Sequence, residues 1–430
     1  MRGRPAFIES RPTYSVIRVA AAVVCGWAAA ACTPNQNGDD AGGLADMSAP
    51  SDESAPADQA TAIQVCPGVP AGQPTNDPWQ RERSTVDLVD DVPGAFQVHV
   101  LYVEPSDRTA TTPLDTNGSL RRSVTAFNAW LVDRTGGPKL RFDTCKGTID
   151  VTYVKLPSPF TERELADGTT LSPNGPPFVR ERLEAELSKT FTDPNKLYLV
   201  YYDGLAFGRC GGAAYPPTVH GHFTGQYIGG IFAATFLTAS ASAGAQQLVV
   251  ADPTQLPLPA APFSATLGSE TVSVQTVQNN VLTIAAPLAT SHAVGDVLQA
   301  ATHPPDCRSN AFSVDGAQLN YWEYSGVHEC MHPLGIVDAR AQDFAPAPVA
   351  PGHLSASNPG AGVADLMYQG TSPWGCPTFP SAANAAASPC ELDPLHRNYF
   401  MVANGSGAID LANSVFLDPS RAGALPPPGW

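Results

Sequence analysis

Two histidines four residues apart bracket a glutamate in the segment GVHECMHPLGIVD, residues 326–338. If this segment is helical, His328 and His332 project from one face, close enough to bind a single Zn²⁺. Glu329 lies beside that face without being a ligand, so it can take a proton from a water held at the metal. The three residues predict a catalytic zinc site that hydrolyses an amide bond.

A catalytic zinc site needs a third protein ligand and keeps its fourth position open. Gly335 and Asp338 complete the pattern HExxHxxGxxD. A glycine with positive φ lets the chain turn back after the helix and bring Asp338 to the metal. His353, in a later loop, is the alternative third ligand. Pro333 disfavours helical geometry at His332, so we expect the helix to end or kink there.

This pattern resembles that of the metzincin metallopeptidases, whose third ligand is usually histidine and in snapalysin-like members is aspartate. The family also has a methionine turn beneath the metal, and Met367 in the segment DLMYQG matches its methionine. The adjacent Tyr368 matches the family's transition-state hydrogen-bond donor, although that tyrosine usually lies two residues after the methionine. The resemblance implies a zinc endopeptidase that acts on protein or peptide substrates.

Helices and strands must position these residues. Their expected order along the chain indicates an α/β (α+β) domain with a mixed sheet. An amphipathic helix is expected over 117–137, with Leu120, Val124, Phe127 and Leu131 on one face. A second helix is expected over 178–191. Strands are expected over 96–103, 139–145, 148–156 and 196–202. The resemblance to metzincins adds a zinc helix, an irregular lower subdomain, and a strand bordering the cleft near residues 221–225 or 229–233.

The predicted catalytic domain, 79–236 plus 302–430, is interrupted by a small all-β insertion over 237–301. In the insertion charged residues nearly vanish and short β-prone runs alternate with turn residues, with Asn279 and Asn280 placed for a tight hairpin. A second hypothesis therefore makes the protein a surface-binding or adhesion lipoprotein that binds through the insertion, with a structural metal or none. A third is a zinc-dependent cell-wall amidase.

The N-terminus has the pattern of a signal peptide, residues 1–31, with arginines before an apolar run too short to span a bilayer. Cys32 follows three alanines and resembles the lipidated cysteine of bacterial lipoproteins. This implies an exported, lipid-anchored protein of the cell envelope, at the outer membrane where the cell has one; simple secretion is the alternative. Residues 32–78 have few large apolar residues and are expected to form a disordered acidic linker.

The seven cysteines that follow Cys32 suit an exported protein in which most cysteines pair. Position favours the pairs Cys210–Cys307 and Cys376–Cys390, and leaves Cys330 in the zinc helix as the free thiol. The net charge of −16, with only 24 Lys and Arg residues, argues against a nucleic-acid partner. We expect a monomer.

Overall fold

The computed structural model describes a chain whose predicted catalytic part is a mixed α/β domain. The described residues are 66, 68, 77–106, 108, 112–157, 179–216, 221–251, 258–345, 352–355, 362–369, 376, 390–402 and 408–430. The predicted signal peptide and Cys32 lie outside these residues. Within them, no helix is long and apolar enough to cross a membrane.

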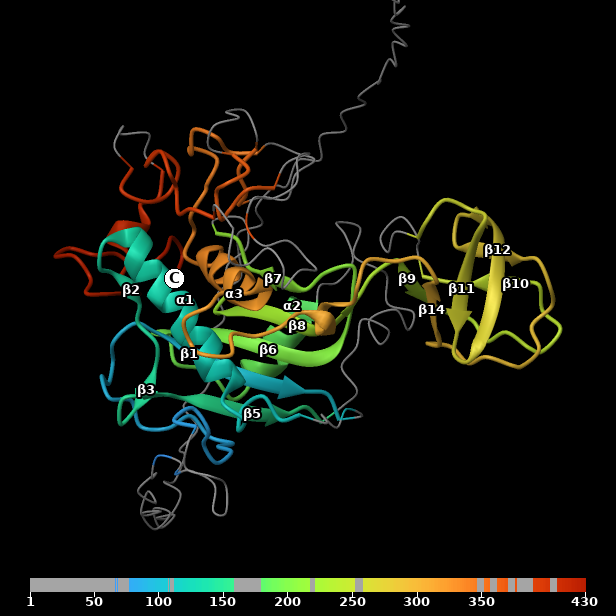
Figure 1. Cartoon of the computed structure of the whole chain (residues 1–430), viewed down its shortest axis with the longest axis horizontal. Helices are drawn as coiled ribbons and strands as arrows, with labels where there is room; N and C mark the ends of the chain where they lie inside the picture. Colours follow the sequence, from blue (N-terminus) through green and yellow to red (C-terminus); the bar gives the residue numbers. More distant parts are fainter. Residues whose placement is uncertain are drawn as a thin grey trace, which may run out of the picture. The chain divides into compact units, whose positions relative to one another are not determined.

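A five-stranded sheet forms the centre of this part, in the order β5-β1-β6-β8-β7 (Figure 1). The first four strands are parallel, and β7 runs antiparallel to β8 at one edge. The strands are β1 (Gln97–Glu104), β5 (Val151–Lys155), β6 (Lys196–Phe207), β7 (Gly211–Ala213) and β8 (Phe223–Ile231). The segments expected to border the cleft, 221–225 and 229–233, fall largely in β8, which pairs with β6 along one side and with the outer strand β7 over residues 224–226.

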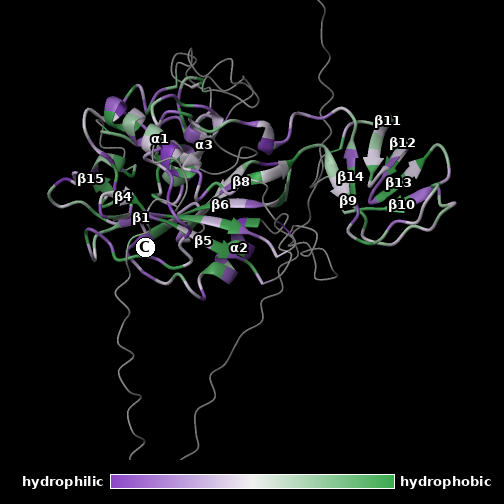
Figure 2. Ribbon diagram, turned by 60° about the horizontal axis from the view of Figure 1, so that its bottom comes forward, coloured by the Kyte–Doolittle hydropathy of each residue, from purple (hydrophilic) through white to green (hydrophobic). Residues whose placement is uncertain are grey.

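Helices cover both faces of the sheet. Helices α1 (Ser119–Thr135) and α3 (Tyr321–Met331) lie on one face, and α2 (Val179–Leu187) on the other (Figures 1 and 2). In β1, Val98 and Val100 are buried with α1 and α3, whereas Leu101 is buried with α2. This alternation follows from the two-residue period of a strand, and burial on both faces explains why the parallel strands are hydrophobic nearly throughout.

The first helix matches its prediction closely. The four apolar residues predicted for its inner face are each at most 1% exposed. Asn117 accepts the backbone N–H of Ser119 through Oδ1 at 2.9 Å, and Gly136 ends the helix with φ 73°. The N-cap residue is Gly118, without a side-chain cap, so Asn117 supports the first turn from one residue earlier, and Gly136 ends the helix in the left-handed region.

Short elements complete the domain. Strand β2 (Lys139–Leu140) pairs with β15 (Leu417–Asp418), which attaches the C-terminal segment, and β3 (Thr144–Cys145) pairs with β4 (Thr148–Ile149). Two 3-10 helices, η2 (Cys307–Ser309) and η4 (Leu411–Asn413), lie in the segments before α3 and before β15.

The predicted insertion forms a six-stranded antiparallel sheet with its own core, which includes Leu248, Val274 and Leu298. Asn279, with φ 54°, forms the predicted hairpin between β12 and β13. The sheet begins three residues before the expected boundary at 237. Its strands are β9 (Ala234–Phe236), β10 (Gln247–Val249), β11 (Phe263–Leu267), β12 (Glu270–Gln278), β13 (Val281–Ile284) and β14 (Val297–Ala300).

Three disulfides are present among the described residues. Cys210–Cys307 and Cys376–Cys390 confirm the predicted pairs, and Cys330 is the buried free thiol that we expected. Cys66, inside the predicted linker, is bonded to Cys145. The chain is therefore attached to the folded domain before the expected linker boundary at 78.

Candidate metal centre

The HExxH motif lies in the last turns of α3. Glu323 fixes the start of this helix by accepting the backbone N–H of Asn320 at 2.8 Å, in a capping box. The helix ends at Met331, and His332, its C-terminal cap, is still in the right-handed helical region. Gly335 follows with φ 76°, and its N–H donates to the carbonyl of His332 at 2.9 Å. The helix thus ends where Pro333 predicted, and the glycine turns the chain.

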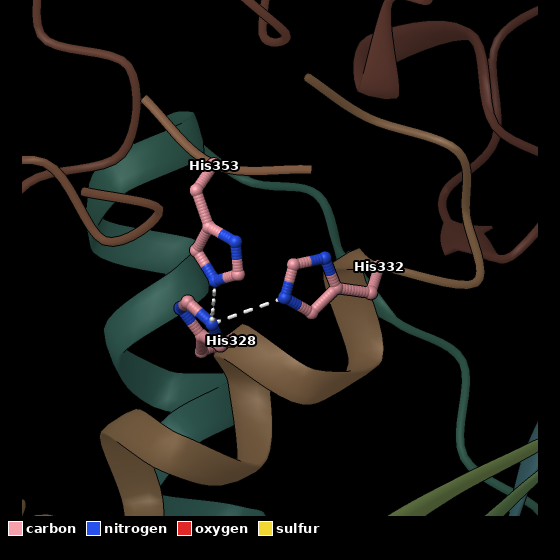
Figure 3. A group of neighbouring side chains, drawn as sticks. All are labelled: His328, His332 and His353. Atoms are coloured by element: carbon pink, nitrogen blue, oxygen red, sulfur yellow. Dashed lines mark hydrogen bonds between the residues drawn. The ribbon is translucent and has the colours of Figure 1, made fainter. Parts of the chain in front are cut away.

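Three imidazole rings converge beside the end of α3 (Figure 3). His328 and His332 project from the helix, and His353 reaches them from a separate loop. The Nε2 atom of His328 lies 3.1 Å from Nε2 of His332 and 3.2 Å from Nε2 of His353. The structure therefore brings together the predicted pair and the alternative third ligand, in a cluster that could bind a metal ion.

Asp338, the favoured third ligand, is not part of this cluster. Both of its carboxylate oxygens lie 3.1 Å from Nε of Arg340, and the backbone N–H of Ile409 donates to Oδ2 at 3.3 Å. The turn at Gly335 is present, but the next residues direct the carboxylate to this arginine. The structure therefore groups His353, the alternative, with the two motif histidines, and Asp338, the favoured residue, lies outside that group.

The protonation of His328 follows from its surroundings. Its Nδ1 lies 2.8 Å from the carbonyl oxygen of Leu366, which can only accept a hydrogen bond. Nδ1 therefore carries the proton, and Nε2 presents a lone pair to the cluster. Burial, together with the neighbouring His353, lowers the pKa of His328 to about 3, and burial also lowers the pKa of His332 well below its usual value. Neutral imidazoles are the form that binds metals.

Tyr215 and Gly352 hold the remaining histidines in place. The Tyr215 ring packs edge-on against His332, and its hydroxyl donates to the carbonyl of Val337 at 2.6 Å. Gly352 has φ 84°, and a Cβ there would lie 2.6 Å from the Tyr215 ring and 2.7 Å from Nδ1 of His332. Only glycine fits this position, so the residue before His353 determines how closely the loop approaches the helix.

Glu329 is half-buried between α3 and the edge of the sheet. Its backbone carbonyl accepts from the Thr224 hydroxyl at 2.7 Å, which ties α3 to β8. Its side chain lies against Gly211 of β7, where a Cβ would be 2.4 Å from Oε1. Burial raises the pKa of Glu329 to about 8, and the positive charge of Arg209 opposes this shift. The predicted general base therefore lies next to the edge strand.

Met367 and Tyr368 lie in a turn formed by residues 364–369, hereafter the methionine turn, in which 365–368 are buried. The carbonyl of Met367 accepts the N–H of Leu354 at 2.9 Å, and Leu354 forms a β-bridge with Tyr368. The predicted methionine turn is thus attached to the loop that carries His353. A catalytic role for Tyr368 stays a prediction.

A second group of titratable residues was not predicted. Asp87, His99, Asp143 and Asp150 bring their ligand atoms within 4.8 Å of one another. Their positions far apart in the sequence give no motif, so sequence reasoning had no signal for them. The ammonium of Lys196 lies 2.7 Å from Asp143 and 2.8 Å from Asp87, so a side chain already supplies a cation there.

No family model, curated protein or solved structure matches this chain.

Proposed function

We propose that the protein is a zinc-dependent endopeptidase of metzincin type, with His328, His332 and His353 as zinc ligands and Glu329 as the general base. The observation that carries the proposal is the convergence of three Nε2 atoms beside a glutamate at the edge of a sheet. Zinc bound tetrahedrally at about 2.0–2.1 Å places its nitrogen ligands about 3.3 Å apart. The observed separations of 3.1 and 3.2 Å are close to this value.

The sheet also supports the proposal. Strand β7 pairs with β8 along one side and is the edge of the five-stranded sheet. An extended peptide can add to such an edge through backbone hydrogen bonds. Glu329 lies against Gly211 of β7, so a peptide on this edge would pass close to the general base.

Zinc supplies Lewis-acid chemistry when bound, because it polarises a carbonyl and lowers the pKa of water. The three histidines would hold the ion and would leave one coordination position open to water or substrate. Glu329 accepts the proton of the attacking water and transfers it to the leaving amine. The carbonyl of Leu366 keeps His328 in the Nδ1–H tautomer, which leaves the Nε2 lone pair for the metal.

The test compares the wild-type protein, Glu329→Gln and the exposed control Glu181→Gln on a mixed peptide library, with products identified by mass spectrometry. We expect cleavage by wild type and control, and a loss of at least about 10²-fold in Glu329→Gln with zinc still bound. Zinc content is measured on each sample. If zinc-loaded wild type cuts no peptide, or if Glu329→Gln cuts as well as wild type, the proposal fails.

A further inference from the structure

The methionine turn hydrogen-bonds to one proposed ligand, His328, and to the residue that follows another, His353. The carbonyl of Leu366 accepts from Nδ1 of His328 at 2.8 Å. The carbonyl of Met367 accepts the N–H of Leu354, the residue after His353, at 2.9 Å. A small shift of this turn would therefore change how both histidines present Nε2 to a metal.

One buried carboxylate fixes the turn from inside. Oδ1 of Asp365 accepts the backbone N–H of Met367 at 2.7 Å, and Asp365 is only 1% exposed. The Tyr399 hydroxyl lies 2.9 Å from the same oxygen. Because the N–H of Asp393 donates to the Tyr399 hydroxyl at 3.0 Å, the hydroxyl's own proton is directed to Asp365. Oδ1 thus accepts two hydrogen bonds of fixed direction.

We propose that Asp365, held by Tyr399, is a positioning residue for the metal centre. It fixes the peptide between Leu366 and Met367, so that the Leu366 carbonyl holds His328 as the Nδ1–H tautomer. The inference rests on the proposed function, since only that function makes His328 a zinc ligand. Outer hydrogen bonds of this kind orient ligands in metal sites, and removing one costs about 10- to 100-fold in affinity.

The test uses Asp365→Ala and Asp365→Asn in the full chain, with zinc affinity measured by competition with a chelator. The alanine removes the acceptor, and we expect zinc to bind about 10- to 100-fold more weakly. The asparagine keeps an oxygen at the position of Oδ1 and should stay within about 3-fold of wild type. Asp410→Ala is the matched control, because Asp410 also accepts a backbone N–H two residues on, from Ala412 at 2.9 Å, in another turn.

A second readout needs no metal. Nitrogen NMR of the metal-free protein reports which ring nitrogen of His328 is protonated. Wild type, Asp365→Asn and Asp410→Ala should show the Nδ1–H form, and Asp365→Ala a mixture of tautomers. Unchanged zinc affinity and an unchanged tautomer in Asp365→Ala would overturn the inference. A wild type that binds no zinc would end the proposed function instead, while the tautomer would still decide the role of Asp365.

The turn keeps other anchors in these variants, because the N–H of Leu366 donates to the carbonyl of Glu391 at 2.9 Å. Should Asp365→Ala still fail to fold, Tyr399→Phe decides the matter. This variant keeps the packed ring and removes the hydroxyl, which donates to Asp365 and accepts the N–H of Asp393. We expect zinc affinity to fall by about 3- to 10-fold, and an affinity equal to wild type would contradict the inference.

Discussion

The carboxylate of Asp338 is bound by the guanidinium of Arg340, with Nε 3.1 Å from each oxygen. The pair lies on the turn that begins at Gly335, where the HExxHxxGxxD pattern would place the third metal ligand. A carboxylate held by an arginine two residues away is already neutralised. The spacing of HExxHxxGxxD is therefore present here, although its aspartate lies outside the histidine cluster.

We expect the third ligand to be identified by zinc affinity. His353→Ala should weaken zinc binding by at least about 10²-fold, because it removes a proposed ligand, whereas Asp338→Asn should change it by less than about 3-fold. Competition with a chelator measures both. Weakening in Asp338→Asn with normal binding in His353→Ala would reverse the assignment.

The position of the Glu329 side chain depends on a glycine, Gly211, in the edge strand β7. A Cβ at Gly211 would lie 2.4 Å from Oε1 and 2.9 Å from Cδ of Glu329. We therefore expect Gly211→Ala to displace this carboxylate and reduce kcat by about 10-fold or more, with zinc affinity unchanged. Ala213→Val, in the same strand, is the control for general changes of the edge. Equal kcat in wild type and Gly211→Ala would show that the carboxylate has room to move without loss.

The parts of the site that sequence predicted are local. His328, Glu329 and His332 follow from helical spacing, and the end of the helix follows from Pro333 and Gly335, because these effects act within one turn of chain. The class of the domain followed from the periodicity of its longer elements. The two disulfides named from position were also correct.

The position of His353 could not be predicted in this way, and sequence named it only as the alternative third ligand. His353 reaches the helix only because the methionine turn, Tyr215 and Gly352 position its loop, and these contacts join segments far apart in the sequence. The edge strand was missed for a related reason. Gly211 and Gly212 have weak strand propensity, and β7 exists because it pairs with β8.

Lys196 is the cation of a buried acidic cluster. Its ammonium is 2.7 Å from Asp143 and 2.9 Å from Asp90, and its side chain is only 4% exposed. Lys196→Met should lower the free energy of unfolding by about 3–5 kcal/mol, because buried carboxylates lose their partner. The exposed Lys189→Met should change it by less than about 0.5 kcal/mol. Urea unfolding measures both, and similar values for the two variants would contradict this role.

Because Lys196 already supplies the positive charge in this cluster, calcium should not raise the melting temperature of the wild type.

His99 gives the same cluster a dependence on pH. Thr152 donates its hydroxyl proton to the carbonyl of Val86 at 3.1 Å, so it accepts from Nε2 of His99 at 3.0 Å. Nδ1 donates to Asp143 at 2.8 Å, and both ring nitrogens therefore carry protons. Burial alone would lower the pKa of His99, but the hydrogen bond to Asp143 and the surrounding carboxylates outweigh burial and raise it.

A raised pKa in the folded state means that the charged histidine stabilises the fold. This stabilisation is fully present below the unfolded-state pKa of about 6.5, and it is lost as pH rises through the folded-state pKa. We expect the wild type to lose more free energy of unfolding than His99→Gln between about pH 5.5 and the alkaline side of the folded-state pKa. Both proteins are measured by urea unfolding with chelator present, so that the titration of the metal-centre histidines is common to both. Parallel stability profiles for the two proteins would mean that His99 is neutral in the fold, and that Lys196 alone balances the carboxylates.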